Sequence, residues 1–178
     1  GITCTFANNN EHVVYYNTLQ MMEDLEITDV PVLKGGRTPG AYDSEAVNFL
    51  VDTVNKNPGE ITVIAIGSMC NIAGAYTKDP KFFEKIHRLI VMGGILEPLY
   101  LNGVLCNELN FTVDSESAAK VIYNCPKVSL LTAQCTQDAV YHLEDLEEML
   151  DMNSNFMRWS RPILKDWIVR KTKDYGNR

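Results

Sequence analysis

Hydrophobic residues recur along this chain at two spacings, in short continuous runs and in longer segments where apolar positions lie three or four residues apart. The short runs predict strands at residues 2–6, 30–33, 61–67, 88–94 and 127–132. The runs at 61–67 and 88–94 are almost wholly apolar, which is typical of parallel strands buried on both faces. The longer spacing predicts helices at residues 11–25, 44–56, 71–79, 81–86 and 115–124.

Strands and helices therefore alternate, and this order indicates an α/β protein with a mainly parallel sheet flanked by helices. After Gln134 the pattern predicts helices and no further strand, so the C-terminal part is expected to be helical. No repeat or low-complexity linker divides the chain, and a single domain over residues 1–178 is the simplest interpretation.

Composition narrows the class of partner. The formal net charge of −7 argues against a nucleic-acid or anionic-membrane binder, because such proteins need a basic face to neutralise phosphates. No apolar run reaches the roughly 18 residues that a membrane-spanning helix needs. The five cysteines are widely spaced and form no CxxC pair, which favours reduced thiols in a cytoplasmic protein over a disulfide framework.

Polar residues and glycines follow each predicted strand. In parallel sheets ligands bind beyond the carboxyl ends of the strands, so these segments are the first place to look for a site. The alternative is that they only form turns, and one of Asn8, Asn9 and Asn10 is expected to cap the helix that follows. None matches a Walker or dinucleotide-binding motif, so a phosphate site is not predicted.

The segment at 102–114, "NGVLCNELNFTVD", mixes amide and carboxyl groups with apolar residues. If it is extended, Glu108 and Asn110 face one side, and Leu109 and Phe111 face the other side, toward the core. Carboxylate and amide groups together suit a polyhydroxylated ligand such as a sugar. A buried structural hydrogen-bond network is the open alternative. Asp114 is predicted to cap the next helix.

Six motifs in order give a resemblance that no single motif carries. They are "GITCTFANN" (1–9), "VPVLKGG" (30–36), "AIGSMCNIAGA" (65–75), "IVMGG" (90–94), "NGVLCNELNFTVDSESAAKVI" (102–122) and "LLTAQCTQ" (130–137). The set resembles the inosine–uridine preferring nucleoside hydrolase family. The resemblance implies a Rossmann-like hydrolase core and hydrolysis of ribonucleosides, which are small molecules, to ribose and a free base in purine and pyrimidine salvage.

The resemblance also implies a site. By motif position, the residues expected to hold ribose hydroxyls or to pack against the ribose are Asn8, Met92, Asn102, Glu108 and Asn110. The family uses Ca²⁺, and Cys70 would offer its backbone carbonyl to the ion, a ligand type that calcium favours. Family members are often dimers or tetramers, so a homo-oligomer is an expectation of the same kind.

Two parts of the family pattern have no counterpart here. The aspartate-rich motif that precedes "GIT" in the family would lie ahead of Gly1, and a late Asp- and His-containing segment would lie beyond Arg178. We therefore expect a domain truncated at both ends, with an incomplete sheet and calcium ligand set, no assigned catalytic residue and no activity by itself. The alternative is a non-catalytic nucleoside- or ribose-binding, or regulatory, α/β domain.

Overall fold

The computed structural model describes residues 1–137, 139, 142–148 and 154–175. Its strands are β1 (Ile2–Thr3), β2 (Val32–Leu33), β3 (Thr62–Ala65), β4 (Arg88–Met92), β5 (Leu99–Leu101), β6 (Val104–Cys106) and β7 (Val128–Leu131). Its helices are α1 (Glu11–Asp24), α2 (Glu45–Lys56), α3 (Cys70–Lys78), α4 (Phe82–Lys85), α5 (Ser115–Asn124), α6 (Ala133–Thr136), α7 (Leu143–Glu148) and α8 (Asn155–Tyr175), with a 3₁₀ turn at Thr112–Asp114.

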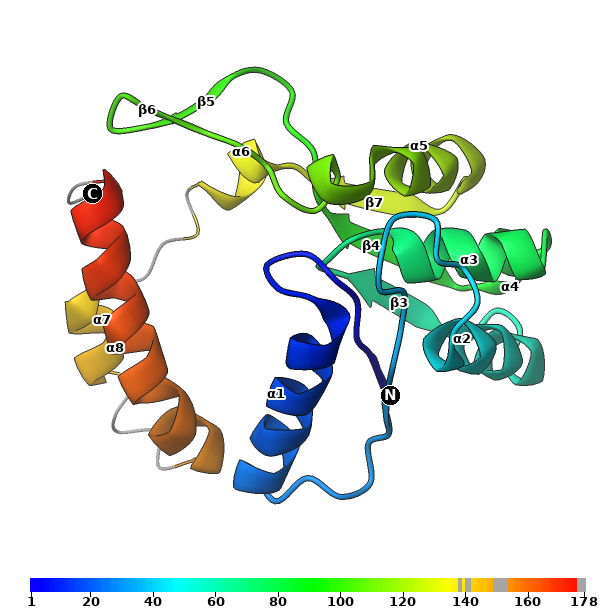
Figure 1. Cartoon of the computed structure of the whole chain (residues 1–178), viewed down its shortest axis with the longest axis horizontal. Helices are drawn as coiled ribbons and strands as arrows, with labels where there is room; N and C mark the ends of the chain where they lie inside the picture. Colours follow the sequence, from blue (N-terminus) through cyan, green and yellow to red (C-terminus); the bar gives the residue numbers. More distant parts are fainter. Residues whose placement is uncertain (138, 140–141, 149–153, 176–178) are drawn as a thin grey trace.

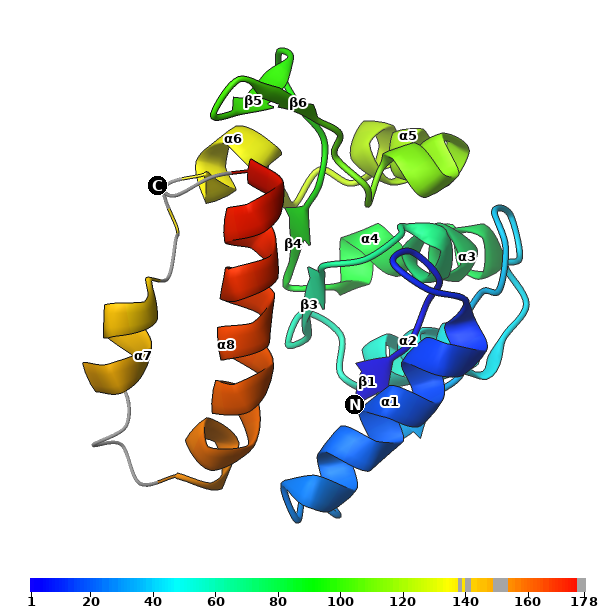
Figure 2. The same cartoon turned by 60° about the vertical axis from the view of Figure 1, so that its left-hand side comes forward.

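Two parallel groups of strands form the centre of the fold. β3, β4 and β7 make a three-stranded parallel sheet in that order, in which Ile64 lies opposite Ile90 and Ile90 opposite Ser129. β1 and β2 pair separately, also in parallel, with Ile2 opposite Val32. Helices flank the strands in both views (Figures 1 and 2), so the predicted α/β class and parallel sheet are confirmed.

The main core lies between the three-stranded sheet and helices α2 to α5. Alternate residues of β3 and β4 point into it, which is why Val63 and Val91 are buried. The prediction that the run at 61–67 is buried on both faces is wrong. Ile64 and Ile66 are 66% and 75% exposed, because the helices of the core cover only the other face of β3.

A β-hairpin that the sequence analysis did not predict follows β4. β5 and β6 pair in antiparallel fashion and project from the body of the molecule (Figure 1). Asn102 and Gly103 form the turn with φ angles of 48° and 79°. Both angles are positive, as a two-residue type I′ turn requires, and Asn-Gly is the dipeptide that tolerates them best.

Side-chain caps set where several helices begin. The Asn10 side chain accepts the backbone N–H of Val13 at 3.0 Å, so this asparagine caps α1. Asp114 accepts the N–H of Ser117 at 3.1 Å, which confirms its predicted role as the cap of α5. These oxygens satisfy N–H groups that have no partner within the helix.

The C-terminal region is helical, as predicted. α8 is joined to α1 by a hydrogen bond of 3.0 Å from Trp159 Nε1 to Asp24 Oδ2. In the part of the chain that the structure describes, no helix has the length and apolar character needed to cross a membrane.

Candidate ribose-binding site

A cleft of about 700 Å³ opens between β1 and β3. Asn8 lines it just after β1, Ser68 just after β3, and Asn110 reaches it from the segment that follows the hairpin. The first two positions lie past the carboxyl ends of parallel strands, where α/β proteins bind ligands. The structure thus brings together Asn8 and Asn110, two residues that the sequence analysis placed at the ribose.

Asn110 is held in place by β4. Its Nδ2 group donates to the Met92 carbonyl at 2.9 Å and lies 3.2 Å from the Met92 sulfur. Asn110 is 9% exposed, and its Oδ1 accepts none of the hydrogen bonds found among the described residues. The side chain is therefore fixed through its donor group, and its oxygen can accept a hydrogen bond from a ligand hydroxyl.

Glu108 is buried and engaged with the backbone around it. Its Oε1 accepts the N–H of Asn110 at 2.5 Å, and its Oε2 accepts the N–H of Phe111 at 2.9 Å. These bonds fold residues 108–111 into a turn, so the segment is not extended. The buried structural network, which the sequence analysis kept as the alternative, therefore describes how Glu108 is used within the chain.

Leu109 and Phe111, the apolar neighbours of Glu108 and Asn110, differ in burial. Phe111 packs against the core, as predicted, but Leu109 is 37% exposed, so its predicted burial is wrong because the segment turns. Phe111 also explains the glycines after β4. A Cβ atom on Gly93 would lie 2.3 Å from the Phe111 ring, so only glycine lets that ring sit there.

Of the six residues expected at the site, only Asn8 and Asn110 line the cleft, and the four that do not are Cys70, Met92, Asn102 and Glu108. Asn102 is exposed in the hairpin turn and does not line the cleft. Cys70 is buried at the start of α3, where its sulfur lies 3.5 Å from the Ala41 carbonyl oxygen. Burial, and secondarily the charge of Asp114, raises the pKa of the Cys70 thiol to about 11. This thiol is accordingly protonated at neutral pH.

Asn71 is a residue of the site that the sequence analysis did not single out. Its Oδ1 accepts the N–H of Gly36 at 2.9 Å, and its Nδ2 donates to the Cys4 carbonyl at 2.8 Å. It lines the cleft and is 3% exposed. One side chain thus ties α3 to the segments that follow β1 and β2. The only sequence signal was an asparagine inside an otherwise apolar helical stretch.

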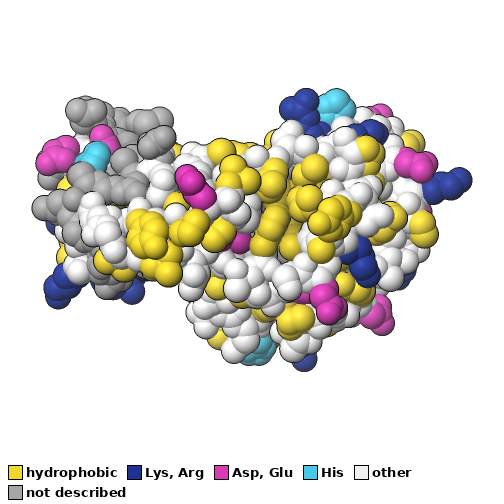
Figure 3. Space-filling view, turned by 90° about the horizontal axis from the view of Figure 1, so that it is seen from above, with side chains coloured by type: hydrophobic (Ala, Val, Ile, Leu, Met, Phe, Trp, Pro, Cys, Tyr) yellow, Lys and Arg dark blue, Asp and Glu magenta, His cyan; other side chains and the backbone are white. Residues whose placement is uncertain are grey.

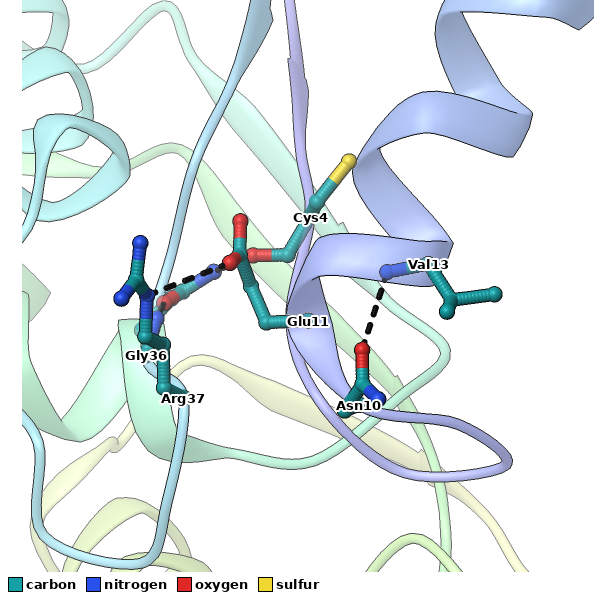
Figure 4. Close-up of polar contacts among 7 residues, drawn as sticks. Cys4, Asn10, Glu11, Val13, Gly36 and Arg37 are labelled. Carbon is teal, nitrogen blue, oxygen red and sulfur yellow. Dashed lines mark hydrogen bonds and ion pairs between the residues drawn. The ribbon is translucent and has the colours of Figure 1, made fainter.

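A buried carboxylate lies beside this connection. Glu11, the first residue of α1, is 1% exposed, and neither of its oxygens has a hydrogen-bond partner among the described residues. Figure 4 shows its side chain directed toward the Gly36–Arg37 segment, with Arg37 Nε 3.6 Å from Oε2. Arg37 is 73% exposed, so water screens this ion pair.

Calcium binds where several oxygen ligands converge. Among the described residues, no group of three or more His, Cys, Asp or Glu lies close enough to hold a metal ion. Both carboxylate oxygens of Glu108 already accept backbone N–H groups. The calcium ion therefore stays a prediction of the family resemblance.

The comparisons with known proteins agree on one family. The model of the family described as inosine-uridine preferring nucleoside hydrolase matches residues 1–177. The chain is 27% identical over 201 residues to "Probable uridine nucleosidase 2" of Oryza sativa subsp. japonica, covering 95% of this chain and 59% of that protein. It is 24% identical over 174 residues to the pyrimidine-specific ribonucleoside hydrolase RihA of Escherichia coli, covering 83% and 55%.

Solved structures show the same fold. The purine-preferring ribonucleoside hydrolase from Gardnerella vaginalis superposes with a TM-score of 0.86 at 21% identity, covering 100% of this chain and 67% of that chain. A plant nucleoside hydrolase, the PpNRh1 enzyme, gives a TM-score of 0.78 at 24% identity over 90% of this chain and 59% of that one. The chain thus spans about 60% of the length of the first relatives that it matches.

Proposed function

Since the chain belongs to the inosine–uridine preferring nucleoside hydrolase family, we propose that it forms the ribose-binding part of a nucleoside N-ribosyl hydrolase. The reaction converts a ribonucleoside and water to ribose and a free base. The observation that carries the proposal is the position of Asn8 and Asn110 on one cleft, with the Asn110 amide fixed by Met92.

Amide groups in this place suit the chemistry. Cleavage of a glycosidic bond passes through an oxocarbenium-like state at C1′, in which the sugar ring flattens. Hydrogen bonds to the 2′- and 3′-hydroxyls would hold the ring in that shape and fix C1′ relative to the attacking water. Asn110 would accept from one hydroxyl through Oδ1, and Asn8 would donate to or accept from the other.

Glu108 has two roles in this proposal. It holds the backbone of Asn110 and Phe111, and each carboxylate oxygen keeps a further lone pair with which it would accept a ribose hydroxyl. Met92 would pack against the ribose. Asn102 would reach the sugar only through movement of the hairpin, and Cys70 would offer its carbonyl to Ca²⁺ in a site completed by other ligands.

The residues around the cleft suit ribose binding by residues 1–178, but not hydrolysis of a nucleoside by these residues alone. Among the described residues that line the cleft, Glu60 alone has a charged side chain, and it precedes β3. It therefore lies at the end of the cleft opposite Asn8 and Asn110. The carboxylate beside Asn110, that of Glu108, would be engaged by two backbone N–H groups and a ribose hydroxyl rather than by water, so the chain would hold ribose but not activate the nucleophile. A non-catalytic ribose-binding domain is accordingly the second proposed function.

Titration calorimetry with D-ribose, with and without Ca²⁺, tests the proposal. We expect binding that Asn110→Ala weakens at least tenfold, whereas Asn17→Ala, an exposed asparagine on α1, leaves it unchanged. Base release from uridine and inosine is followed by chromatography in parallel, and none above background is expected. Ribose binding that is equal in both variants, or absent under all conditions, would reject the proposed site.

A further inference from the structure

Asn8 and Asn110 reach the same cleft, but the structure fixes their side chains differently. The Asn110 amide is bonded to Met92, whereas Asn8 is exposed and its side chain forms no hydrogen bond among the described residues. The place of Asn8 in the cleft therefore depends on its backbone. That backbone belongs to residues 5–9, which join β1 to the cap of α1 at Asn10.

One hydrogen bond ties residues 5–9 to another part of the chain. The hydroxyl oxygens of Thr5 and Ser68 are 2.6 Å apart, although 63 residues separate them in sequence. The hydrogen bond from the Ala7 N–H to the Asn9 carbonyl, at 3.2 Å, stays inside the segment. Among the described residues, the segment forms no further hydrogen bond to the body of the molecule.

Both hydroxyls are held by their surroundings. Ser68 is 4% exposed and stands two residues before α3 begins. A Cβ atom on Gly67 would lie 2.9 Å from the Thr5 methyl carbon, so the absence of a side chain there lets that methyl group pack closely. The Nδ2 group of Asn71, in the first turn of α3, donates to the Cys4 carbonyl at 2.8 Å. Two neighbouring hydrogen bonds thus fix the end of β1 to the start of α3.

Charged groups do not hold residues 5–9. None of the ion pairs found among the described residues involves this segment. In Figure 1 the segment lies at the upper end of α1, toward the face that Figure 3 presents. Hydrophobic side chains gather near the middle of that face (Figure 3). The Thr5–Ser68 hydrogen bond is therefore the polar interaction on which the position of Asn8 depends.

We propose that Thr5 and Ser68 are positioning residues, whose hydrogen bond sets the backbone of residues 5–9 so that Asn8 meets the ribose together with Asn110. This proposal rests on the proposed function, because it assigns Asn8 to a ribose hydroxyl. A group that is held in place before binding loses less conformational freedom when the ligand arrives. Without the bond, the chain would bind ribose more weakly although both asparagines are still present.

Titration calorimetry with D-ribose on matched variants tests the proposal. Thr5→Val and Ser68→Ala each remove one hydroxyl and should weaken binding about three- to tenfold, as expected for the loss of one hydrogen bond. The double variant should be no weaker than either single variant, because all three lose the same bond. Thr5→Ser, which keeps the hydroxyl, should bind as the unaltered chain does. Thr28→Val, at an exposed threonine after α1, is the matched control and should have no effect.

The Asn8→Ala background separates positioning from direct contact with ribose. Asn8→Ala itself should weaken binding about tenfold. Thr5→Val added to it should weaken binding no further, because the residue that it positions is gone. Equal weakening by Thr5→Val with and without Asn8, or no weakening where Asn8→Ala has a clear effect, would overturn the positioning role and leave the proposed function standing. If Asn8→Ala has no effect, the ribose role of Asn8 fails and the positioning role fails with it.

Nuclear magnetic resonance gives a measurement that needs no ligand. Backbone amide order parameters of residues 6–9 should be about 0.85 in the unaltered chain and should fall below about 0.6 in Thr5→Val and in Ser68→Ala. Order parameters in β3 and α3 should not change, which also shows that a variant folds. Ser68→Ala removes the bond from the other side, so the test holds if Thr5→Val does not fold. Unchanged order parameters at residues 6–9 would overturn the proposal.

Discussion

Replacing Asn71 with leucine should destabilise the fold strongly, although leucine has nearly the same shape. The change removes the bonds to the Gly36 N–H and the Cys4 carbonyl, both of which are 2.9 Å or less in length. Asn71 is only 3% exposed, and Gly35 packs so closely that a Cβ there would lie 1.9 Å from the Cys4 oxygen and 2.5 Å from Asn71 Nδ2. Two buried backbone groups would lose their partners.

The magnitude follows from those two groups. Each buried group left unsatisfied costs about 1–3 kcal/mol, so the free energy of unfolding should fall by about 2–6 kcal/mol. That is a large share of the ~5–15 kcal/mol that stabilises a typical domain. Urea unfolding measures it, with Asn17→Leu on the exposed face of α1 as the matched control. A loss below about 1 kcal/mol would refute the role given to Asn71.

Three further predictions concern other parts of the molecule. Glu11→Leu should raise the free energy of unfolding by about 1–4 kcal/mol, because it removes a buried carboxylate without hydrogen-bond partners among the described residues. If urea unfolding shows that this free energy falls instead, the ion pair with Arg37 stabilises the fold and the prediction is wrong. Cys135 should be alkylated by iodoacetamide well before Cys70 at pH 8. A hydrogen bond with Thr132 lowers the pKa of the exposed Cys135 thiol, whereas burial raises the pKa of the Cys70 thiol to about 11. Equal alkylation rates in peptide mass spectrometry would contradict this order. Gly93→Ala should cost about 1–3 kcal/mol through the clash with the Phe111 ring, and a melting temperature equal to that of the unaltered chain would refute the contact.

The fold class and most helix boundaries could be predicted from spacing, because several helices bury one face and begin at a polar cap. Ser44 and Asp114 are caps of this kind, and both stand directly before an apolar helical pattern. Burial of individual strand faces could not be predicted. An apolar run looks the same whether its second face is covered or, as at Ile64, left exposed.

The family resemblance placed Asn8 and Asn110 at the ribose by motif position, and the structure brings both to one cleft beyond the carboxyl ends of parallel strands. The turn at Glu108 was missed because its side chain bonds to its own backbone two and three residues ahead, and period-two reasoning assumes an extended segment. The hairpin was readable in advance, since Asn102 and Gly103 stand between two apolar runs.

The central claim is that Asn110 recognises a ribose hydroxyl, and the sharpest test compares uridine with 2′-deoxyuridine on the wild-type chain and on Asn110→Ala. If Asn110 holds the 2′-hydroxyl, the wild-type chain should bind uridine about tenfold more tightly, which corresponds to about 1.4 kcal/mol for one hydrogen bond. The variant should bind both nucleosides equally. A preference that is the same in both chains would contradict the account.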